Sequence, residues 1–147
     1  MKIYFLLLLF TGLRNSEVVN LLRTYDKNML RVEDGVALYP LQWYRGTKKG
    51  LYAFMPTSLS SKIKRFSVSE YYYKNYYQRK GLKLRPKYIR KFAATTMFKL
   101  GLASEVVDFI QGRTPRSTLA RHYLRLLPIA VKEYRKYSDY ITELLKL

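Results

Sequence analysis

Apolar positions fall into short blocks along the chain, and their spacing predicts the first elements. A continuous apolar run predicts a buried helix over residues 2–12, ended by Gly12. The run is too short to cross a membrane and lacks the small-residue cleavage region of a secretory signal. Residues 14–23 then show the apolar period of a second helix, so the chain opens with two helices joined by a tight turn.

The following stretch has the pattern of a small antiparallel sheet. Three short segments are rich in β-branched and aromatic residues: 29–33, 36–41 and 51–55. Asp34-Gly35 separates the first two and is a strong signal for a tight hairpin, whereas the turn over residues 45–50 is longer. Pro56 is expected to end the third strand because proline cannot donate to a ladder.

The rest of the chain reads as helices. The expected helices cover residues 57–66, 68–79, 86–100, 104–111, 115–126 and 128–146. Ser67 and Glu70 have the spacing of a capping box for the second of these. Its five tyrosines, at 71, 72, 73, 76 and 77, cannot all be buried. The last helix carries an apolar stripe of Ile129, Tyr134, Tyr137, Ile141 and Leu144 or Leu145. The pattern predicts a mainly α fold with a small three-stranded antiparallel sheet (α+β), in a single domain over residues 1–147.

The net charge of the chain indicates what kind of partner it binds. The chain of 147 residues holds 28 Lys and Arg against 10 Asp and Glu, a formal charge of +18. So large a surplus favours a polyanion, either nucleic acid or an anionic membrane, with a basic ribosomal or structural protein as the alternative. Cysteine is absent and His122 is the single histidine, which excludes disulfides, thiolate metal sites and a zinc site built on histidine.

The junction between the first two helices is the first candidate site. It reads Thr-Gly-Leu-Arg-Asn-Ser-Glu over residues 11–17. Ser16 and Glu17 are close enough in sequence to hold the side chain of Arg14, and a buried, pre-aimed guanidinium suits a phosphate. The alternative is a surface arginine that caps the end of a helix.

A second basic cluster opens the helix over residues 86–100. Lys87 and Arg90 are three residues apart, so both are expected on one face at a helix N-terminus, where anions are favoured. The alternative is a solvated basic face. Arg113 follows Gly112 farther on and can donate hydrogen bonds to a phosphate. The alternative is an ordinary charge at the end of a helix. The acidic residues are scattered, so no two-metal site is expected.

These motifs resemble the catalytic domain of the tyrosine recombinases, the phage integrase family, and most of all archaeal integrases of the fusellovirus type. The 11–17 segment resembles the first arginine motif of the family. Lys87-Tyr-Ile-Arg90, before Phe-Ala-Ala-Thr, resembles the Lys-x-x-Arg form of the second. Gly112-Arg113 stands where the family commonly has Gly-His, and Tyr123 follows at about the spacing of the family nucleophile.

The resemblance implies roles for these residues. Tyr123 would be the nucleophile, and Arg14 and Arg90 would clamp the phosphate. Lys87 and Arg113 would assist. The family lysine that protonates the leaving oxygen commonly lies eight residues before the proline that ends the next strand, which selects Lys48 and leaves Lys49 in reserve. The residues expected to contact the DNA backbone are Lys49, Arg45, Arg85, Lys91, Arg116 and Arg121.

The function implied is site-specific recombination, as in viral integration and excision, through a 3′-phosphotyrosyl intermediate with no metal or cofactor. The expected partners are double-stranded DNA at attachment sites and further copies of the chain in a tetramer, with no membrane, in the cytoplasm of the host cell. Residues 128–147 would dock on a neighbouring protomer or pack on their own core. The additional N-terminal DNA-binding domain of the family is expected to be absent. A type IB topoisomerase and a non-catalytic basic DNA-binding module remain the alternatives.

Overall fold

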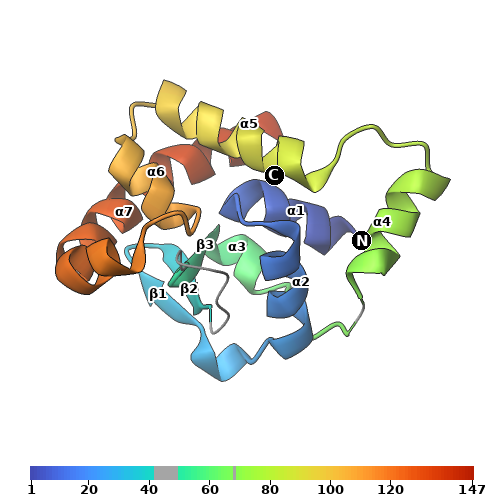
Figure 1. Cartoon of the computed structure of the whole chain (residues 1–147), viewed down its shortest axis with the longest axis horizontal. Coiled ribbons are helices and arrows are strands. Elements are labelled where there is room, and N and C mark those ends of the chain that lie inside the picture. Colours follow the sequence, from blue (N-terminus) through green and yellow to red (C-terminus); the bar gives the residue numbers. More distant parts are fainter. Residues whose placement is uncertain (42–49, 68) are drawn as a thin grey trace.

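The computed structural model describes residues 1–41, 50–67 and 69–147 (Figure 1). The helices, in chain order, are α1 (Lys2–Thr11), α2 (Asn15–Thr24), the 3-10 helix η1 (Lys27–Met29), α3 (Thr57–Ser60), α4 (Glu70–Arg79), α5 (Pro86–Lys99), α6 (Ser104–Ile110) and α7 (Arg116–Leu144). The strands are β1 (Arg31–Glu33), β2 (Val36–Pro40) and β3 (Tyr52–Pro56). The mainly helical α+β architecture with one small antiparallel sheet is confirmed.

The sheet has the order β1-β2-β3, with both pairs antiparallel. Val36 faces Glu33 on one side and Pro56 on the other, so Asp34 and Gly35 form a two-residue turn. Their φ angles of 46° and 79° lie in the left-handed region that a tight hairpin of this length requires. The hairpin predicted from Asp34-Gly35 is therefore confirmed, as is the end of the third strand at Pro56.

Helix α1 lies at the centre of the molecule, in contact with α2, α5 and β3 (Figure 1). Its buried side chains are Tyr4, Leu7, Leu8, Phe10 and Thr11. The last carbonyls of a helix have no partner within the helix. Two tyrosines of α7 supply partners here, since Tyr134 donates to the carbonyl oxygen of Phe10 at 2.8 Å and Tyr137 donates to that of Leu9 at 2.5 Å. Helix α7 is thereby fixed to the end of α1 that leads into Arg14.

Helix α3 is shorter than the sequence predicts. It ends at Ser60 and does not continue to Phe66. The backbone N–H of Phe66 donates to the carbonyl oxygen of Leu22 at 2.8 Å, so this segment bonds to α2 and cannot also close helical turns. A long-range backbone contact has replaced the expected local one.

The predicted start of α4 is also wrong. The helix begins at Glu70 with Ser69 as its N-cap, so the expected capping box between Ser67 and Glu70 does not form. The expectation that its tyrosines divide between core and surface is confirmed. Tyr73 and Tyr77 are buried, whereas Tyr71 and Tyr72 are exposed.

Helix α7 is continuous through Pro128, where the sequence predicts two helices with a break. A proline inside a helix removes one backbone hydrogen bond and costs about 3 kcal/mol. Leu126 and Leu127 before the proline and Ala130 and Val131 after it are all buried, so the core holds both halves in line. Burial on both sides of the proline has outweighed its local preference.

The apolar stripe of α7 packs mainly on the chain itself. Tyr134, Tyr137 and Ile141 are fully buried, in agreement with packing on the chain's own core. Ile129 and Leu144, which the helical period places on the same stripe, are exposed. The predicted stripe is therefore correct at its centre and wrong at its ends.

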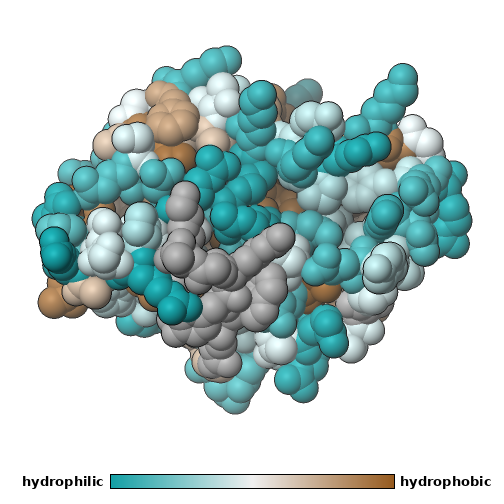
Figure 2. Space-filling model, viewed as in Figure 1, coloured by the Kyte–Doolittle hydropathy of each residue, from teal (hydrophilic) through white to brown (hydrophobic). Residues whose placement is uncertain are grey.

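The surface is strongly polar. The face in Figure 2 is mostly hydrophilic, with small and scattered hydrophobic areas. None of the described helices is long and apolar enough to cross a membrane.

Candidate active site

Arg14 is held at the junction of α1 and α2 by a carboxylate one helical turn away. It occupies the N-cap position of α2, and its backbone N–H donates to Glu17 Oε2 at 2.8 Å. Its Nη1 donates to Glu17 Oε1 at 3.1 Å. Glu17 therefore orients Arg14, as the spacing predicts. Ser16 does not take part, because its buried Oγ has no hydrogen-bond partner in the described part of the chain.

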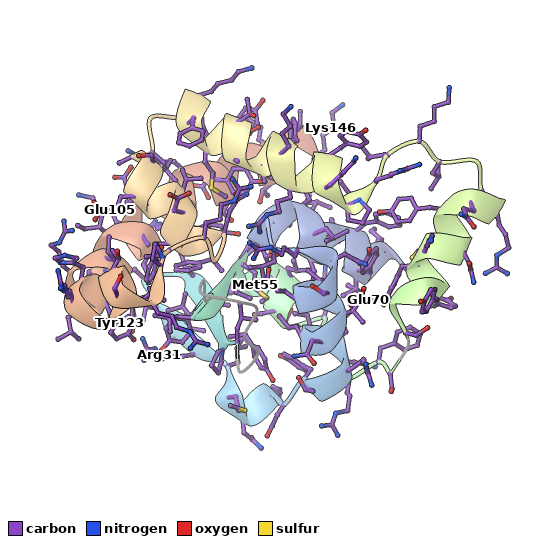
Figure 3. All side chains as sticks on the ribbon, in the orientation of Figure 1. Arg31, Met55, Glu70, Glu105, Tyr123 and Lys146 are labelled. Atoms are coloured by element: carbon purple, nitrogen blue, oxygen red, sulfur yellow. The ribbon has the colours of Figure 1, made fainter. Side chains whose placement is uncertain are left out.

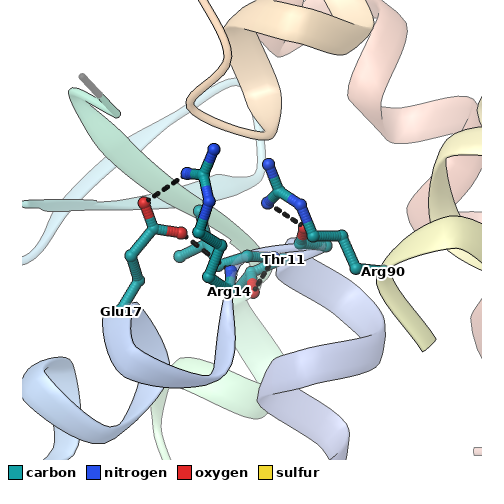
Figure 4. Close-up of polar contacts among 6 residues, drawn as sticks. Thr11, Arg14, Glu17 and Arg90 are labelled. Atoms are coloured by element: carbon teal, nitrogen blue, oxygen red, sulfur yellow. Dashed lines mark hydrogen bonds and ion pairs between the residues drawn. The ribbon is translucent and has the colours of Figure 1, made fainter. Parts of the chain in front are cut away.

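Arg90 reaches the same junction from α5, far away in the sequence. Only 8% of the residue is exposed, and its Nη1 donates to the carbonyl oxygen of Gly12 at 2.7 Å. The guanidinium groups of Arg14 and Arg90 lie side by side and point the same way, toward the connection between α6 and α7 (Figure 4). Arg14 is the more open of the two, with 30% of its side chain exposed, so the sequence-based expectation of a buried guanidinium fits Arg90 better.

Three guanidinium groups act on one another here. Burial, followed by the charges of Arg14 and Arg113, lowers the pKa of Arg90 to about 10. Glu17 and Asp108 oppose this shift. The Nη2 atom of Arg90 is buried and has no hydrogen-bond partner among the described residues. A cluster with excess positive charge and an unused buried donor suits an oxoanion, which would supply both acceptor and counter-charge.

Gln111 supports this cluster, and no pattern in the sequence indicates its role. It is fully buried, and its Nε2 donates to the backbone oxygen of Arg90 at 3.1 Å. A Cβ atom placed on Gly12 would lie only 2.7 Å from the same Nε2. Gln111 thus packs between the backbone of Gly12 and that of Arg90. A buried polar side chain beside two arginines is the kind of signal that could have identified it, but its burial cannot be read from the sequence.

The turn after α6 packs tightly against the segment that leads into β3. Gly112 has a φ of +67°, and a Cβ atom there would lie 2.9 Å from Gly50 Cα. Gly50 lies two residues before β3 and is the first described residue after position 49. The same Cβ would lie 3.6 Å from Glu17 Oε1. Only glycine permits this approach, which brings Arg113 to the arginine cluster.

Tyr123 lies on the first part of α7 and is partly buried against the core. Its hydroxyl is 3.2 Å from the hydroxyl of Tyr52 on β3, and Arg31 of β1 is a further neighbour. Within the described residues, its hydrogen-bond partners come from the sheet and not from Arg14, Arg90 or Arg113. Of the other tyrosines of α7, Tyr134 and Tyr137 are buried with their hydroxyls bonded to α1, as expected for core residues.

The remaining predicted residues lie around the cluster or outside the described part of the chain. Lys87 is exposed, and its Nζ lies 5.0 Å from the centre of the Tyr88 ring, with no described contact to Arg90. Four predicted DNA contacts are exposed: Arg85, Lys91, Arg116 and Arg121. Lys48, Lys49 and Arg45 fall outside the described residues. Among the described residues, no three His, Asp or Glu side chains gather closely enough to hold a metal ion.

The chain matches one known protein family over most of its length. The model of the archaeal phage integrase family matches residues 1–140, nearly the whole chain. The chain belongs to that family. No curated protein matches the chain. Membership of an integrase family assigns the chain to site-specific recombination and therefore to DNA as its partner. The phosphates of the DNA backbone are oxoanions, and arginine side chains commonly bind them.

Proposed function

We propose that this integrase-family chain is the catalytic domain of a tyrosine recombinase, which cuts and rejoins DNA through a 3′-phosphotyrosyl intermediate. The observation that carries the proposal is the pairing of Arg14 with Arg90. Two guanidinium groups from segments distant in sequence lie side by side, one of them buried with an unused donor. Such a pair suits the charge that builds on the non-bridging oxygens of a phosphodiester under attack.

The remaining roles follow from the chemistry that strand cleavage needs. The Tyr123 oxygen attacks the phosphorus, and the bond from phosphorus to the 5′-oxygen breaks. Lys48, with Lys49 in reserve, gives that oxygen its proton. Arg113 adds a third guanidinium to the clamp, and Lys87 assists from the outer face of α5. Attack by the 5′-hydroxyl of a second strand then reverses the steps and releases Tyr123.

The charge of the chain supports a broad contact with the DNA backbone. The exposed residues Arg85, Lys91, Arg116 and Arg121, together with Lys49 and Arg45, would hold phosphates on either side of the cleaved one. Binding should therefore weaken steeply as salt rises. Recombination joins two duplexes, so the active form would be a tetramer, with the exposed end of α7 as a contact between protomers.

The test is covalent capture of DNA. A library of nicked duplexes of random sequence lets the short fragment that bears the new 5′-hydroxyl diffuse away after cleavage, which traps the protein on the DNA. We expect an adduct that mass spectrometry maps to Tyr123, loss of the adduct in Tyr123→Phe, and normal capture in the control Tyr140→Phe, which changes an exposed tyrosine of the same helix.

Three outcomes would contradict the proposal. If Tyr123→Phe still captured DNA, Tyr123 could not be the nucleophile. DNA binding with no adduct on any substrate would favour a non-catalytic DNA-binding module. Relaxation of a supercoiled plasmid without any joining of paired sites would favour a topoisomerase.

A further inference from the structure

The hydroxyl of Tyr123 is held in a small polar group on the sheet, separate from the arginine cluster. Its partner is the hydroxyl of Tyr52, at 3.2 Å. The guanidinium of Arg31 lies over the Tyr52 ring, with its Cζ atom 5.3 Å from the ring centre, and also neighbours the Tyr123 oxygen. Figure 3 shows Arg31 and Tyr123 close together where α7 meets the sheet. Three elements, β1, β3 and α7, therefore converge on one phenol.

A phenol that serves as a nucleophile needs this kind of surrounding. Its ordinary pKa is about 10, so at neutral pH it is almost entirely protonated and a poor nucleophile. A nearby cation and a hydrogen-bond donor both favour the ionised form. Arg121 and His122 are the basic residues next to Tyr123 in the sequence. Both are exposed, and the described contacts of Tyr123 include neither.

Tyr52 is suited to be the donor of the pair. Its hydrogen bond to Tyr123, together with burial, raises the pKa of Tyr52, and the charge of Arg31 only partly opposes this shift. Tyr52 thus keeps its proton at neutral pH. A protonated Tyr52 can donate to the Tyr123 oxygen, and that bond gains strength when the acceptor is ionised.

Arg31 is suited to be the cation. Burial lowers its pKa, but the tyrosine oxygens and Glu33 outweigh this and leave the pKa raised, so Arg31 remains charged. Glu33 bonds Arg31 Nη2 at 2.7 Å, which offsets part of the charge and fixes the guanidinium in place. The other charged pair near this part of α7 is Arg125 with Glu105 of α6, at 2.6 Å, and it is self-neutralising.

We propose that Arg31 and Tyr52 are positioning residues that hold the Tyr123 oxygen and favour its phenolate before attack on the scissile phosphate. The phenolic proton leaves to water, the Tyr123 oxygen keeps the electron pair, and the bond to phosphorus forms with that pair. Neither positioning residue touches the phosphate. The inference rests on the proposed function, because it requires Tyr123 to be the nucleophile.

The experiment is the rate of covalent capture on the nicked-duplex library, measured for each variant between about pH 6.5 and 9.5. In Arg31→Gln we expect capture to be about tenfold slower at pH 7, because without the neighbouring charge the phenolic proton is harder to remove before attack. The deficit should shrink as the pH rises, because hydroxide then removes that proton without help from Arg31. Arg31→Lys should restore most of the rate, and Tyr52→Phe should slow capture about threefold in the same pH-dependent way.

Two matched controls accompany these variants. Arg135→Gln removes one positive charge from an exposed site on α7, about 18 Å along the helix from Tyr123, and Tyr140→Phe removes an exposed hydroxyl. Both should follow the wild-type pH profile. If Arg31→Gln lost the same factor at every pH, or matched the wild type, the inference would be wrong, while loss of capture in Tyr123→Phe would leave the proposed function standing. Capture that persists in Tyr123→Phe would instead overturn both.

Discussion

Arg90 donates from Nη1 to the carbonyl oxygen of Gly12 at 2.7 Å, across a separation of 78 residues. Arg14 follows two residues after Gly12, so this bond ties α5 to the segment that carries the other arginine. Gln111 strengthens the link from a third segment, through its bond to the backbone of Arg90. Arg90 is therefore held through backbone atoms, which leaves its buried Nη2 without a partner among the described residues and available to a ligand.

Replacement of Arg90 by lysine should make DNA cleavage sensitive to pH. The surroundings lower the pKa of Arg90 from 12.5 to about 10. A similar shift would take the pKa of a lysine, ordinarily about 10.4, to roughly 8. Arg90→Lys should then lose its charge as the pH rises through roughly 8, and cleavage should fall there, while the wild type keeps its arginine charged. The measurement is the cleavage rate between pH 6.5 and 9. A flat profile in the variant would contradict the lowering of the pKa at this position by burial and by the charges of Arg14 and Arg113.

Loss of the Glu17 charge should destabilise the chain and make it more dependent on anions. Glu17→Gln leaves Arg14 and Arg90 without their nearest carboxylate and weakens the bond to the Arg14 backbone, at a cost of about 1–2 kcal/mol in the free energy of unfolding. Urea unfolding would measure this. Added sulfate should narrow the difference from the wild type, because an anion replaces the lost charge.

Glu133→Gln is the matched control for Glu17, because Glu133 forms an ion pair of the same spacing with Lys136 at 2.8 Å on the surface. It should change the free energy of unfolding by less than about 0.5 kcal/mol, and sulfate should not affect the difference. An equal response of the two variants to sulfate would count against an anion site at Arg14 and Arg90.

Gly112 and Gly81 form a pair that separates steric contact from backbone strain. Both have left-handed φ angles, +67° and +63°, but a Cβ atom on Gly81 meets nothing within 4 Å, whereas one on Gly112 meets Gly50 Cα at 2.9 Å. Gly81→Ala should cost about 1 kcal/mol. Gly112→Ala should cost about 1–3 kcal/mol more and slow cleavage, because the shift also moves Arg113. If Gly112→Ala and Gly81→Ala lost the same stability in thermal or urea unfolding, the turn after α6 would be free to move away from Gly50.

Replacement of Pro128 should stabilise α7. Pro128→Ala adds a backbone donor in the middle of a helix that is already continuous, so the free energy of unfolding should rise by about 1–2 kcal/mol after allowance for the more flexible unfolded chain. Lys132→Ala, at an exposed position one turn later, is the comparison and should have little effect. Urea unfolding of both variants provides the measurement, and a Pro128→Ala variant less stable than the wild type would indicate that the proline ring itself packs favourably.

The sequence determined the features whose causes are local. Gly12 ends α1 in the left-handed conformation, Asp34-Gly35 forms the tight hairpin, and Glu17 holds Arg14 one turn away. Each of these depends on a few neighbouring residues and on backbone preferences that the residue types reveal. The resemblance to integrases also rested on short local motifs, chiefly the 11–17 segment and Lys87-Tyr-Ile-Arg90, and the family match confirms it.

Tertiary structure decided the rest. The bond from Arg90 to Gly12, the contact of Tyr123 with Tyr52 across 71 residues, and the packing of Gly112 on Gly50 depend on how distant segments meet. The same applies to α7, which stays helical at Pro128 because the core holds both of its halves, and to α3, which ends early because Phe66 bonds to α2. Burial and long-range hydrogen bonds outweigh local preferences of a few kcal/mol, and these contacts exist only after the chain has folded.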